Sequence, residues 1–320
     1  MNCTYCNVDK FSKTKIDPEL CIQQFQTLKK KKPKEKFRID FFGGEPLLHW
    51  NIVQEIVEAI KADVDQFFMP TNGLLLTNEK IEYLNINNFK VSLSFDGLWQ
   101  DINRRQHNNN GTLNLYLQKK ELFKKLKKLT CHTMVYKGNY NLLENHCFIK
   151  STLGINSQLT LVRDKDVWDQ ESVCKFKIGF TELVDWYITH VNIEELPGMI
   201  LEYLRHILLY SVKRLSIDNC GAGESFLSFT DNELLPCNRF QETQYIEKIP
   251  LYKKMNACES CDVKNFCRKG CLYENIKNEG PISELCDMYR HIYKEISRMV
   301  SELNHSNVFR SILQKEIYEC

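Results

Sequence analysis

The chain has 320 residues, of which 43% are apolar and 11% aromatic, so it can fill the cores of about two domains and is neither disordered nor fibrous. Its 43 Lys and Arg against 41 Asp and Glu leave a net charge of +2, and we therefore expect neither a nucleic acid nor a membrane as partner. No apolar run approaches the roughly 18 residues of a membrane span, and the polar start is unlike a secretory signal, which predicts a soluble, cytoplasmic protein.

Helical patterns alternate with short apolar runs from residue 11 to about residue 165, which predicts repeated βα units around a parallel sheet. The expected strands are 37–42, 66–70, 90–94, 131–136 and 158–162. The expected helices, each with apolar residues at roughly helical spacing, are 18–30, 51–62, 78–84, 113–129 and 141–153. This alternation predicts an α/β fold, a partial and open TIM-like (β/α) barrel.

The rest of the chain has a different composition. Residues 166–215 carry aromatic and long apolar side chains at helical spacing, so we expect a helical bridge there. Residues 216–320 have few strand signals and many cysteines, and they end in a helix. We expect this segment to depend on bound metal for its order, because ligand binding supplies folding free energy that a thin core lacks. The expected domains are therefore 1–165, 166–215 and 216–320.

Several features have ordinary structural explanations. The lysine-rich stretches 29–36 and 119–128 fit the solvated sides of outer helices better than a nucleic-acid surface. In the second stretch, the expected buried stripe is Leu115, Leu122, Phe123, Leu126 and Leu129. Isolated cysteines usually behave as small buried hydrophobes, which we expect of Cys21, Cys131, Cys147, Cys174 and Cys320. Without metal-binding spacing, surface or core roles are expected for His107, His132 and His146.

Fourteen cysteines in a chain of this size indicate metal or redox chemistry rather than a disulfide scaffold. Two of them form the CxxC motif at residues 3–6, which by itself is equally compatible with zinc and with thiol redox chemistry. Polar motifs follow three successive predicted strands: Gly-Gly-Glu-Pro at 43–46, Thr-Asn-Gly at 71–73 and Ser-Phe-Asp-Gly at 94–97. Because the carboxyl ends of parallel strands share one face, we expect these motifs to meet in one pocket.

In these motifs the chain resembles the radical S-adenosylmethionine (radical SAM) enzymes, whose signature is CxxxCxxC after the first strand and GGE after the second. Cys3 and Cys6 match the second and third cysteines of that signature, and Tyr5 occupies its usual aromatic position. The first cysteine and the strand that leads to it would lie before Met1. We therefore expect the natural start to lie upstream, so that this chain is N-terminally truncated and its barrel lacks the first strand.

The resemblance implies a [4Fe-4S] cluster with one iron left open to chelate S-adenosylmethionine (SAM). One electron passed into the bound sulfonium would break its S–C bond and release a 5′-deoxyadenosyl radical, which removes hydrogen from carbon. Glu45 would accept from the methionyl ammonium, Ser94 would face the ribose, and Arg104 would meet the methionyl carboxylate. Glycines would let the backbone approach the cofactor closely. The implied cofactor-binding residues are Gly43, Gly44, Glu45, Asn72, Ser94 and Arg104.

A second group of cysteines lies in the last third of the chain. The four with the shortest spacing, which alone would allow a structural zinc site or a ferredoxin-like cluster, are Cys258, Cys261, Cys267 and Cys271. Further cysteines on either side make the whole similar to the seven-cysteine pattern of the SPASM domain, a C-terminal extension of peptide-modifying radical SAM enzymes. The resemblance implies two auxiliary [4Fe-4S] clusters, a distal one on Cys258, Cys261, Cys267 and Cys286 and a proximal one on Cys220, Cys237 and Cys271.

Three positions depart from the SPASM relatives. Asn232 stands where that pattern has glycine, and Asn is the residue that best tolerates a left-handed backbone after glycine. Anaerobic sulfatase maturases carry a fourth proximal cysteine where this chain has Phe226, and an aspartate where it has Asn238. Asparagine cannot act as a base, and three thiolates leave an iron of the proximal cluster open. Both differences argue against formylglycine synthesis and favour a site that binds a substrate thiol or amide.

We therefore expect a radical SAM oxidoreductase that oxidatively modifies a peptide or protein side chain, with a ribosomal-peptide maturase as the leading interpretation. Hydrogen abstraction leaves a second electron to be removed, and a chain of clusters offers it an exit. The expected partners are a peptide or protein substrate and a low-potential electron donor of the flavodoxin or ferredoxin type. The alternatives are a formylglycine-forming enzyme like the sulfatase maturases, and a truncated, inactive iron–sulfur or zinc protein that only binds a peptide.

Overall fold

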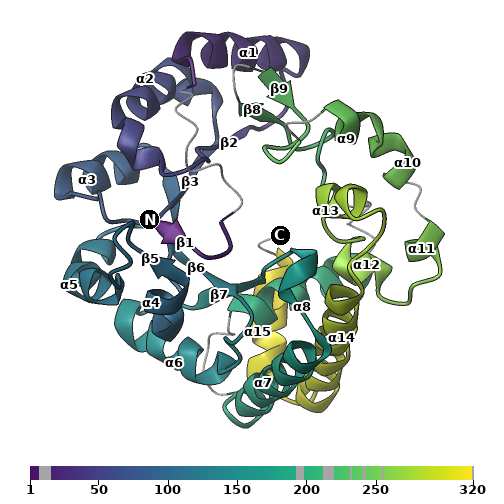
Figure 1. Ribbon diagram of the computed structural model, residues 1–320. Helices are drawn as coiled ribbons and strands as arrows, with labels where there is room; N and C mark the ends of the chain where they lie inside the picture. Colours follow the sequence, from purple (N-terminus) through teal and green to yellow (C-terminus); the bar gives the residue numbers. More distant parts are fainter. Residues whose placement is uncertain are drawn as a thin grey trace. The chain divides into compact units, whose positions relative to one another are not determined.

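A parallel β-sheet carries the first part of the chain in the computed structural model (Figure 1). Its strands, in the spatial order β2-β3-β4-β6-β7, are β2 Arg38–Asp40, β3 Gln66–Thr71, β4 Phe89–Ser94, β6 Leu129–Val135 and β7 Ser157–Leu161. The pairs β2–β3, β3–β4 and β4–β6 are parallel, with Thr71 opposite Leu93 and Ser94 opposite His132. The five predicted strands are confirmed, and the polar motifs follow the carboxyl ends of the first three.

The structure describes residues 1–6, 16–191, 198–211, 220–230, 233–240, 243–253 and 256–318, and the chain divides into two units. Unit 1 comprises Met1–Thr133, Cys147–Gln158 and Phe229–Glu233. Unit 2 comprises Met134–His146, Leu159–Ser228 and Leu234–Cys320. The CxxC motif and the three strand-end motifs all belong to unit 1, and the seven cysteines of the C-terminal pattern all belong to unit 2. Asn232 lies outside the described residues.

Helices alternate with the strands of the sheet, as the sequence predicts. They are α1 Pro18–Lys31, α2 Trp50–Ile60, α3 Asn78–Ile86, α5 Leu113–Phe123 and α6 Leu142–Leu153. The side chain of Asp17 caps α1 by accepting from two backbone amides, with proline at the first helical position, and Thr77 caps α3 by accepting from one. The predicted helix 113–129 is wrong in its second half. It ends at Phe123, because Leu129 already pairs with Val91 as the first residue of β6.

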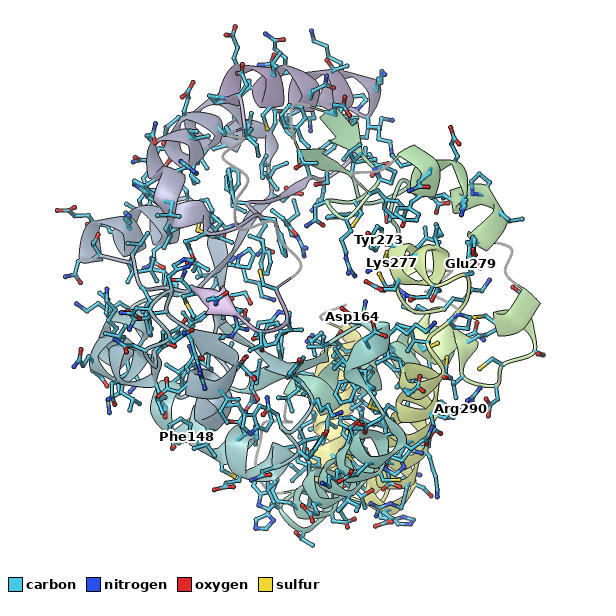
Figure 2. The ribbon with its side chains drawn as sticks, viewed as in Figure 1. Phe148, Asp164, Tyr273, Lys277, Glu279 and Arg290 are labelled. Carbon is cyan, nitrogen blue, oxygen red and sulfur yellow. The ribbon has the colours of Figure 1, made fainter. Side chains whose placement is uncertain are left out.

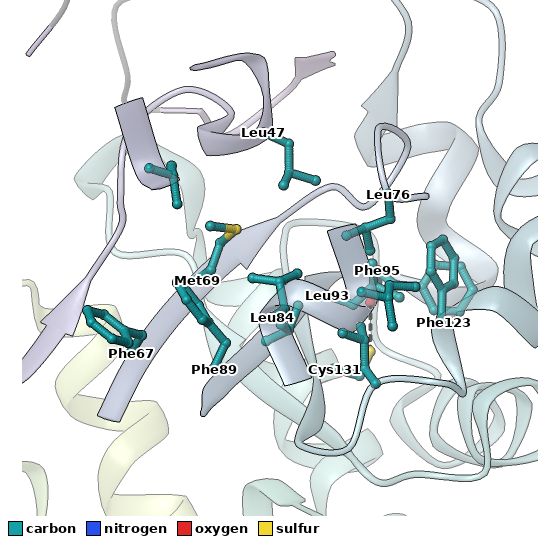
Figure 3. Close-up of a cluster of buried hydrophobic side chains, with 14 of the residues drawn as sticks. Leu47, Phe67, Met69, Leu76, Leu84, Phe89, Leu93, Phe95, Phe123 and Cys131 are labelled. Carbon is teal, nitrogen blue, oxygen red and sulfur yellow. Dashed lines mark hydrogen bonds between the residues drawn. The ribbon is translucent and has the colours of Figure 1, made fainter. Parts of the chain in front are cut away.

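The core of unit 1 lies between the sheet and these helices (Figure 3). In β3 the burial alternates, so that Phe67, Met69 and Thr71 are buried while the residues between them are only half-buried. In Figure 3 strand side chains such as Phe89 and Leu93 lie with Leu84 of α3 and Phe123 of α5. Full burial of each such side chain is worth about 1.5–3 kcal/mol. This core fixes the strands whose ends carry the polar motifs.

Short elements complete unit 1. They are β1 Asn2–Cys3, η1 Pro46–His49, η2 Lys61–Asp63, η3 Gly97–Trp99, α4 Gln100–Asn103 and β5 Arg104–Arg105. β1 pairs antiparallel with β5, which sets Cys3 opposite Arg104. The CxxC motif is therefore attached to the segment that follows β4, about 100 residues later in the sequence.

Unit 2 contains the long helices α7 Gln170–Thr189, α8 Gly198–Ser211, α14 Ser283–Leu303 and α15 Asn307–Tyr318, and the short η4 Lys165–Val167. Asp169 and Ser172 form a reciprocal capping box at the start of α7. Polar contacts at three levels join α7 to α14, and they are Lys177–Asp287, Thr181–His291 and Asp185–Arg298. Among the described residues, no helix has both the length and the apolar character needed to cross a bilayer.

In its described residues, the cysteine-rich segment between α8 and α14 contains only short elements. They are β8 Ser228–Thr230, β9 Glu233–Leu235, α9 Thr243–Glu247, α10 Ile249–Lys253, α11 Asn256–Glu259, α12 Lys264–Cys267 and α13 Leu272–Lys277. β8 and β9 form a two-stranded sheet. The small core consists of Ala222, Phe240, Ile249, Leu272 and Ile276, with partly buried aromatic rings around it. The predicted scarcity of strands in this segment is confirmed.

The isolated cysteines are only partly the buried hydrophobes that we predicted. Cys131 is fully buried in β6, where its thiol contacts the carbonyl oxygen of Phe95 (Figure 3), and Cys21 is half-buried on α1. For Cys147 and Cys174 the prediction is wrong, because both lie on outward-facing positions of α6 and α7 and are exposed. Cys320 lies outside the described residues.

Candidate active site and cysteine clusters

Glu45 joins the end of β2 to the end of β3. Its carboxylate accepts hydrogen bonds from the Thr71 hydroxyl at 2.6 Å, from the Asn72 amide at 2.8 Å and from the Leu47 amide at 3.2 Å. Burial raises the pKa of Glu45, and these three hydrogen bonds oppose the rise. A carboxylate offers about four acceptor positions, so one remains for a further donor such as an ammonium group.

The two glycines before Glu45 face open space. A Cβ atom added to Gly43 or Gly44 would meet no heavy atom within 4 Å. The φ of Gly43 is +138°, a value that side-chain-bearing residues rarely adopt. By contrast, a Cβ on Gly73 would lie 2.5 Å from the Leu93 side chain. Packing against Leu93 explains why residue 73 is a glycine. At position 44 no neighbouring atom requires a glycine, and its missing side chain leaves room for a ligand to reach the backbone.

A buried ionic network seats the CxxC motif. Asp96, which is 0% exposed, accepts a hydrogen bond of 2.5 Å from the Tyr5 hydroxyl and one of 3.1 Å from the Asn103 amide, both at Oδ2. The same oxygen lies 3.0 Å from Nε of Arg104, whose guanidinium stacks 5.3 Å from the centre of the Tyr5 ring. Tyr5, one of the two residues between the cysteines of the motif, is thus tied to the loop after β4.

Arg104 keeps part of its hydrogen-bonding capacity. It is 7% exposed, and its positive charge has Asp96 as counter-ion. Within the part of the chain that the structure describes, its two Nη nitrogens make no hydrogen bond. Burial raises the pKa of the Cys3 thiol, and the nearby Arg104 charge opposes that rise. The guanidinium therefore lies beside the CxxC motif with two donor groups available for an anion.

Asn72 and Ser94 occupy the remaining predicted positions at the strand ends. The Asn72 side-chain oxygen accepts from the Leu74 amide at 2.9 Å, so this oxygen shapes the turn after β3. Ser94 is half-buried, and its carbonyl oxygen accepts a 2.9 Å hydrogen bond from the Tyr116 hydroxyl. All six predicted cofactor-binding residues belong to unit 1: Gly43, Gly44, Glu45, Asn72 and Ser94 lie at or just after the ends of β2, β3 and β4, and Arg104 begins β5.

Four of the unit 2 cysteines affect one another electrostatically. Burial raises the pKa of the Cys267 thiol to about 11, and the thiols of Cys286, Cys261 and Cys258 contribute to that rise. Burial also raises the pKa of Cys286, where Cys258 and Cys261 again act in the same direction. These are the four cysteines that the resemblance assigns to the distal cluster.

The other three form a separate set. Burial raises the pKa of the Cys237 thiol, and the neighbouring thiols of Cys271 and Cys220 add to it. Cys220 is exposed, whereas Cys237 and Cys271 are half-buried. Among the described residues, no three His, Cys, Asp or Glu side chains converge as the ligands of one metal ion do. A [4Fe-4S] cluster does not require that convergence, because it spreads its thiolates over separate irons.

A left-handed turn separates Cys267 from Cys271. The three residues between them have φ angles of 55° at Arg268, 58° at Lys269 and 72° at Gly270. Left-handed backbone costs a residue with a side chain roughly 1–2 kcal/mol, so tertiary contacts must hold this turn. Lys269 supplies one of them, because its buried ammonium lies 2.8 Å from the Glu259 carboxylate. The turn lets two cysteines that are close in sequence belong to different sets.

Several residues of the site have roles that sequence reasoning did not find. Asp96 lies in a predicted strand-end motif, yet its part as the counter-ion of Arg104 depends on the β1–β5 pairing. Asn103 and Tyr116 contact the site from α4 and α5. Thr71 was visible only as part of the Thr-Asn-Gly motif, and its hydroxyl orients Glu45.

Comparison with known proteins gives relatives for both parts of the chain. Residues 1–144 match the model of the Radical SAM superfamily. Radical SAM cyclopropyl synthase TigE of Paramaledivibacter caminithermalis is 23% identical over 97% of this chain and 73% of TigE. An uncharacterized protein of Archaeoglobus fulgidus is 22% identical over 99% of this chain and 83% of its own length.

Solved structures show a similar fold. Native anSMEcpe with bound AdoMet and Kp18Cys peptide has a TM-score of 0.76 at 18% identity, and the match covers 95% of each chain. Native anSMEcpe with bound AdoMet alone gives a TM-score of 0.75 at 19% identity, again covering 95% of each chain. At this identity the likeness shows a shared α/β fold with a parallel sheet. The superfamily match spans the CxxC motif, Gly43 to Glu45 and the network around Asp96, so residues 1–144 belong to the radical SAM superfamily.

Proposed function

We propose that this radical SAM enzyme oxidatively modifies a side chain of a peptide or protein, and that its substrate is a ribosomally made peptide. The observation that carries the proposal is the match of residues 1–144 to the Radical SAM superfamily together with seven cysteines in unit 2, whose thiols raise one another's pKa within a group of four and within a group of three. Two such sets fit two auxiliary [4Fe-4S] clusters, which a net two-electron oxidation can use. The likeness to TigE and to anSMEcpe with a bound peptide supports a peptide substrate.

The residues of unit 1 fit SAM and a [4Fe-4S] cluster. In the proposal Cys3 and Cys6 hold the cluster together with one further thiolate, and SAM binds along the strand ends. When bound, the two supply an electron for S–C cleavage and a radical that removes hydrogen from the substrate. Glu45 has one acceptor position left for the methionyl ammonium, and the open space beside Gly44 admits the cofactor to the backbone.

Charge and shape assign the remaining contacts to SAM. The two Nη nitrogens of Arg104 suit the methionyl carboxylate, because a guanidinium pairs with carboxylates through parallel hydrogen bonds. Asp96 holds the guanidinium in place from its Nε side. Ser94 and Asn72 complete the pocket on the ribose side.

The proximal set suits contact with the substrate. Its thiolates come from Cys220, Cys237 and Cys271, which leaves one iron without a cysteine, and Cys220 is exposed. Phe226 and Asn238 replace the cysteine and the aspartate of sulfatase maturases. The amide of Asn238 accepts from the Cys237 thiol at 3.4 Å and carries no acidic proton to exchange. These features support a peptide maturase over a formylglycine-forming enzyme.

The proposal also covers the organisation and setting of the protein. The radical SAM domain would be residues 1–165, followed by a helical bridge at 166–215 and a SPASM domain with a C-terminal helix at 216–320. Reduced thiols and oxygen-sensitive clusters are compatible with a cytoplasmic location. The electron donor would be a low-potential flavodoxin or ferredoxin type of protein.

Anaerobic reconstitution with iron and sulfide tests the proposal. We expect iron and acid-labile sulfide for two clusters in unit 2, and a further cluster when the chain is extended to place a cysteine two residues before Met1. That extended form should cleave SAM to 5′-deoxyadenosine. A protein that binds zinc and no iron would refute the proposed enzymatic function and would favour a scaffold that only binds a peptide. Conversion of Cys or Ser in a sulfatase peptide to formylglycine would establish the maturase alternative instead.

A matched pair of variants tests the ligand assignment. Cys271→Ala should lower the iron content by about one cluster, because it removes a thiolate of the proximal set. Cys174→Ala removes an exposed thiol of α7 that belongs to neither set and should leave the iron content unchanged. Equal iron in both variants would remove Cys271 from the ligands.

A further inference from the structure

Each cysteine set in unit 2 has an arginine at one of its sulfur atoms. Nη1 of Arg239 donates a hydrogen bond to Sγ of Cys271 at 3.7 Å, in the proximal set. In the distal set, desolvation lowers the pKa of Arg290, but the charge of Cys261 and a side-chain hydrogen bond to it raise that pKa overall. Figure 2 labels Arg290 on α14, and Tyr273 on α13 marks the surroundings of Arg239.

The two arginines differ in how firmly they are held. Arg239 forms an ion pair with the buried carboxylate of Glu274, and its guanidinium stacks 4.7 Å from the centre of the Tyr273 ring. Its side chain is 23% exposed. Arg290 is 51% exposed, and its nearest carboxylate, that of Asp262, lies 4.0 Å away. Solvent therefore screens the charge of Arg290 much more than that of Arg239.

A second cation, which is half-buried, lies near Cys271. Arg163 lies just after β7. Its side chain is half-buried, although its Nε atom is fully enclosed, and both Tyr289 and Cys271 raise its pKa. Burial raises the pKa of the Glu202 carboxyl, and the nearby charge of Arg163 opposes that rise. Thus Cys271 lies near two guanidinium groups, of which only Arg239 donates directly to its sulfur among the described residues.

We propose that Arg239 is the positioning residue that sets the reduction potential of the proximal cluster, holding it above the value that Cys220, Cys237 and Cys271 alone would give. This inference rests on the proposed function, because it requires a cluster at that site. A hydrogen bond and a positive charge at a ligand sulfur stabilise an added electron, and both raise the potential of an iron–sulfur cluster. In the half-buried surroundings of Arg239 the effect is larger than in water.

The consequence is a difference between the two auxiliary clusters. The proximal cluster has three thiolates and a fixed guanidinium, whereas the distal one has four thiolates and an exposed guanidinium. The proximal cluster therefore accepts an electron more readily than its ligands alone would allow. Arg239 acts only through Cys271, so its replacement changes a potential and leaves the cluster ligands in place.

Redox titration followed by electron paramagnetic resonance tests this role. The full chain, with Cys3→Ala and Cys6→Ala so that only the auxiliary clusters titrate, is reconstituted anaerobically, and Cys271→Ala identifies the proximal signal by its loss. Arg239→Gln should shift the proximal midpoint to more negative potential, and Arg239→Lys should shift it less because the charge remains. Arg290→Gln, the matched control, should leave the proximal midpoint unchanged.

Glu274→Gln gives a shift of the opposite sign. It removes the negative charge beside Arg239 while the stacking on Tyr273 remains, so the proximal midpoint should become more positive. If Arg239→Gln loses its cluster, the sign of the Glu274→Gln shift decides: a positive shift supports the inference, and a zero or negative one overturns it. Unchanged midpoints in both variants overturn it as well. Absence of any cluster from the parent chain would instead refute the proposed function.

Discussion

Replacement of Asp96 by Asn removes the negative charge at the centre of the network that seats the CxxC motif. In the native chain Oδ2 of Asp96 accepts hydrogen bonds from the Tyr5 hydroxyl and the Asn103 amide, and it lies 3.0 Å from Nε of Arg104 as an ion pair without a hydrogen bond. The variant leaves the guanidinium of Arg104 with 7% exposure and without a counter-ion among the described residues. Removal of one partner of a buried ion pair typically costs about 3–5 kcal/mol, because the other charge remains out of water. We expect a loss of this size in the free energy of unfolding of unit 1.

Asp40→Asn is the matched control. Asp40 also binds an arginine through two contacts, both 2.7 Å from Arg38, but the Arg38 side chain is 55% exposed. Loss of an exposed pair costs only about 0.2–1 kcal/mol. Urea unfolding, monitored through the hydrogen exchange of the peptide that contains β4, measures the free energy of unfolding of unit 1 in both variants. If Asp96→Asn costs less than about 1 kcal/mol, or no more than Asp40→Asn, Asp96 is not the counter-ion of a buried charge.

Three further predictions follow from the same structure. Gly73→Ala should lower the free energy of unfolding by about 1–3 kcal/mol, because the new Cβ would overlap the Leu93 side chain at a φ of +73°. Gly44→Ala should keep the native melting temperature but weaken SAM binding, measured by calorimetry, about tenfold or more. Equal melting temperatures would contradict the first, and unchanged SAM affinity the second. Burial lowers the pKa of His291, so the unfolded chain binds more protons than the folded one below about pH 6.5 and stability should fall on acidification. His291→Gln should flatten that pH dependence in urea titrations, and an unchanged slope would contradict the assignment.

Much of the fold of unit 1 can be read from the sequence because its periodicities are local. The runs at 66–70 and 90–94 are apolar strands between helical patterns, and the structure places β3 and β4 within one residue of them. The helix predicted at 113–129 fails for a related reason. Its leucine and lysine pattern continues past Phe123 with nearly helical spacing, and only the pairing of Leu129 with β4 shows that the chain has become a strand.

The site is predictable where a motif lies on one segment and unpredictable where two segments meet. Gly43 to Glu45 and Asp96 were visible as motifs at strand ends. The contact of Tyr5 with Asp96 joins residues 91 positions apart, and no local pattern indicates it. The turn between Cys267 and Cys271 is similar, since no propensity favours left-handed backbone at Arg268 or Lys269. Spacing alone therefore left zinc and iron–sulfur ligation open.

The two candidate sites depend on different sources of free energy. The CxxC motif of unit 1 is positioned by a strand pairing, a buried ion pair and a large apolar core, all of which exist without a metal. The cysteine-rich part of unit 2 has a small core, around Phe240 and Leu272, and a turn that carries unfavourable backbone energy. Cluster binding is the remaining term that can offset this cost. Removal of iron should therefore disorder the segment around Cys258 to Cys271 while the sheet of unit 1 stays folded.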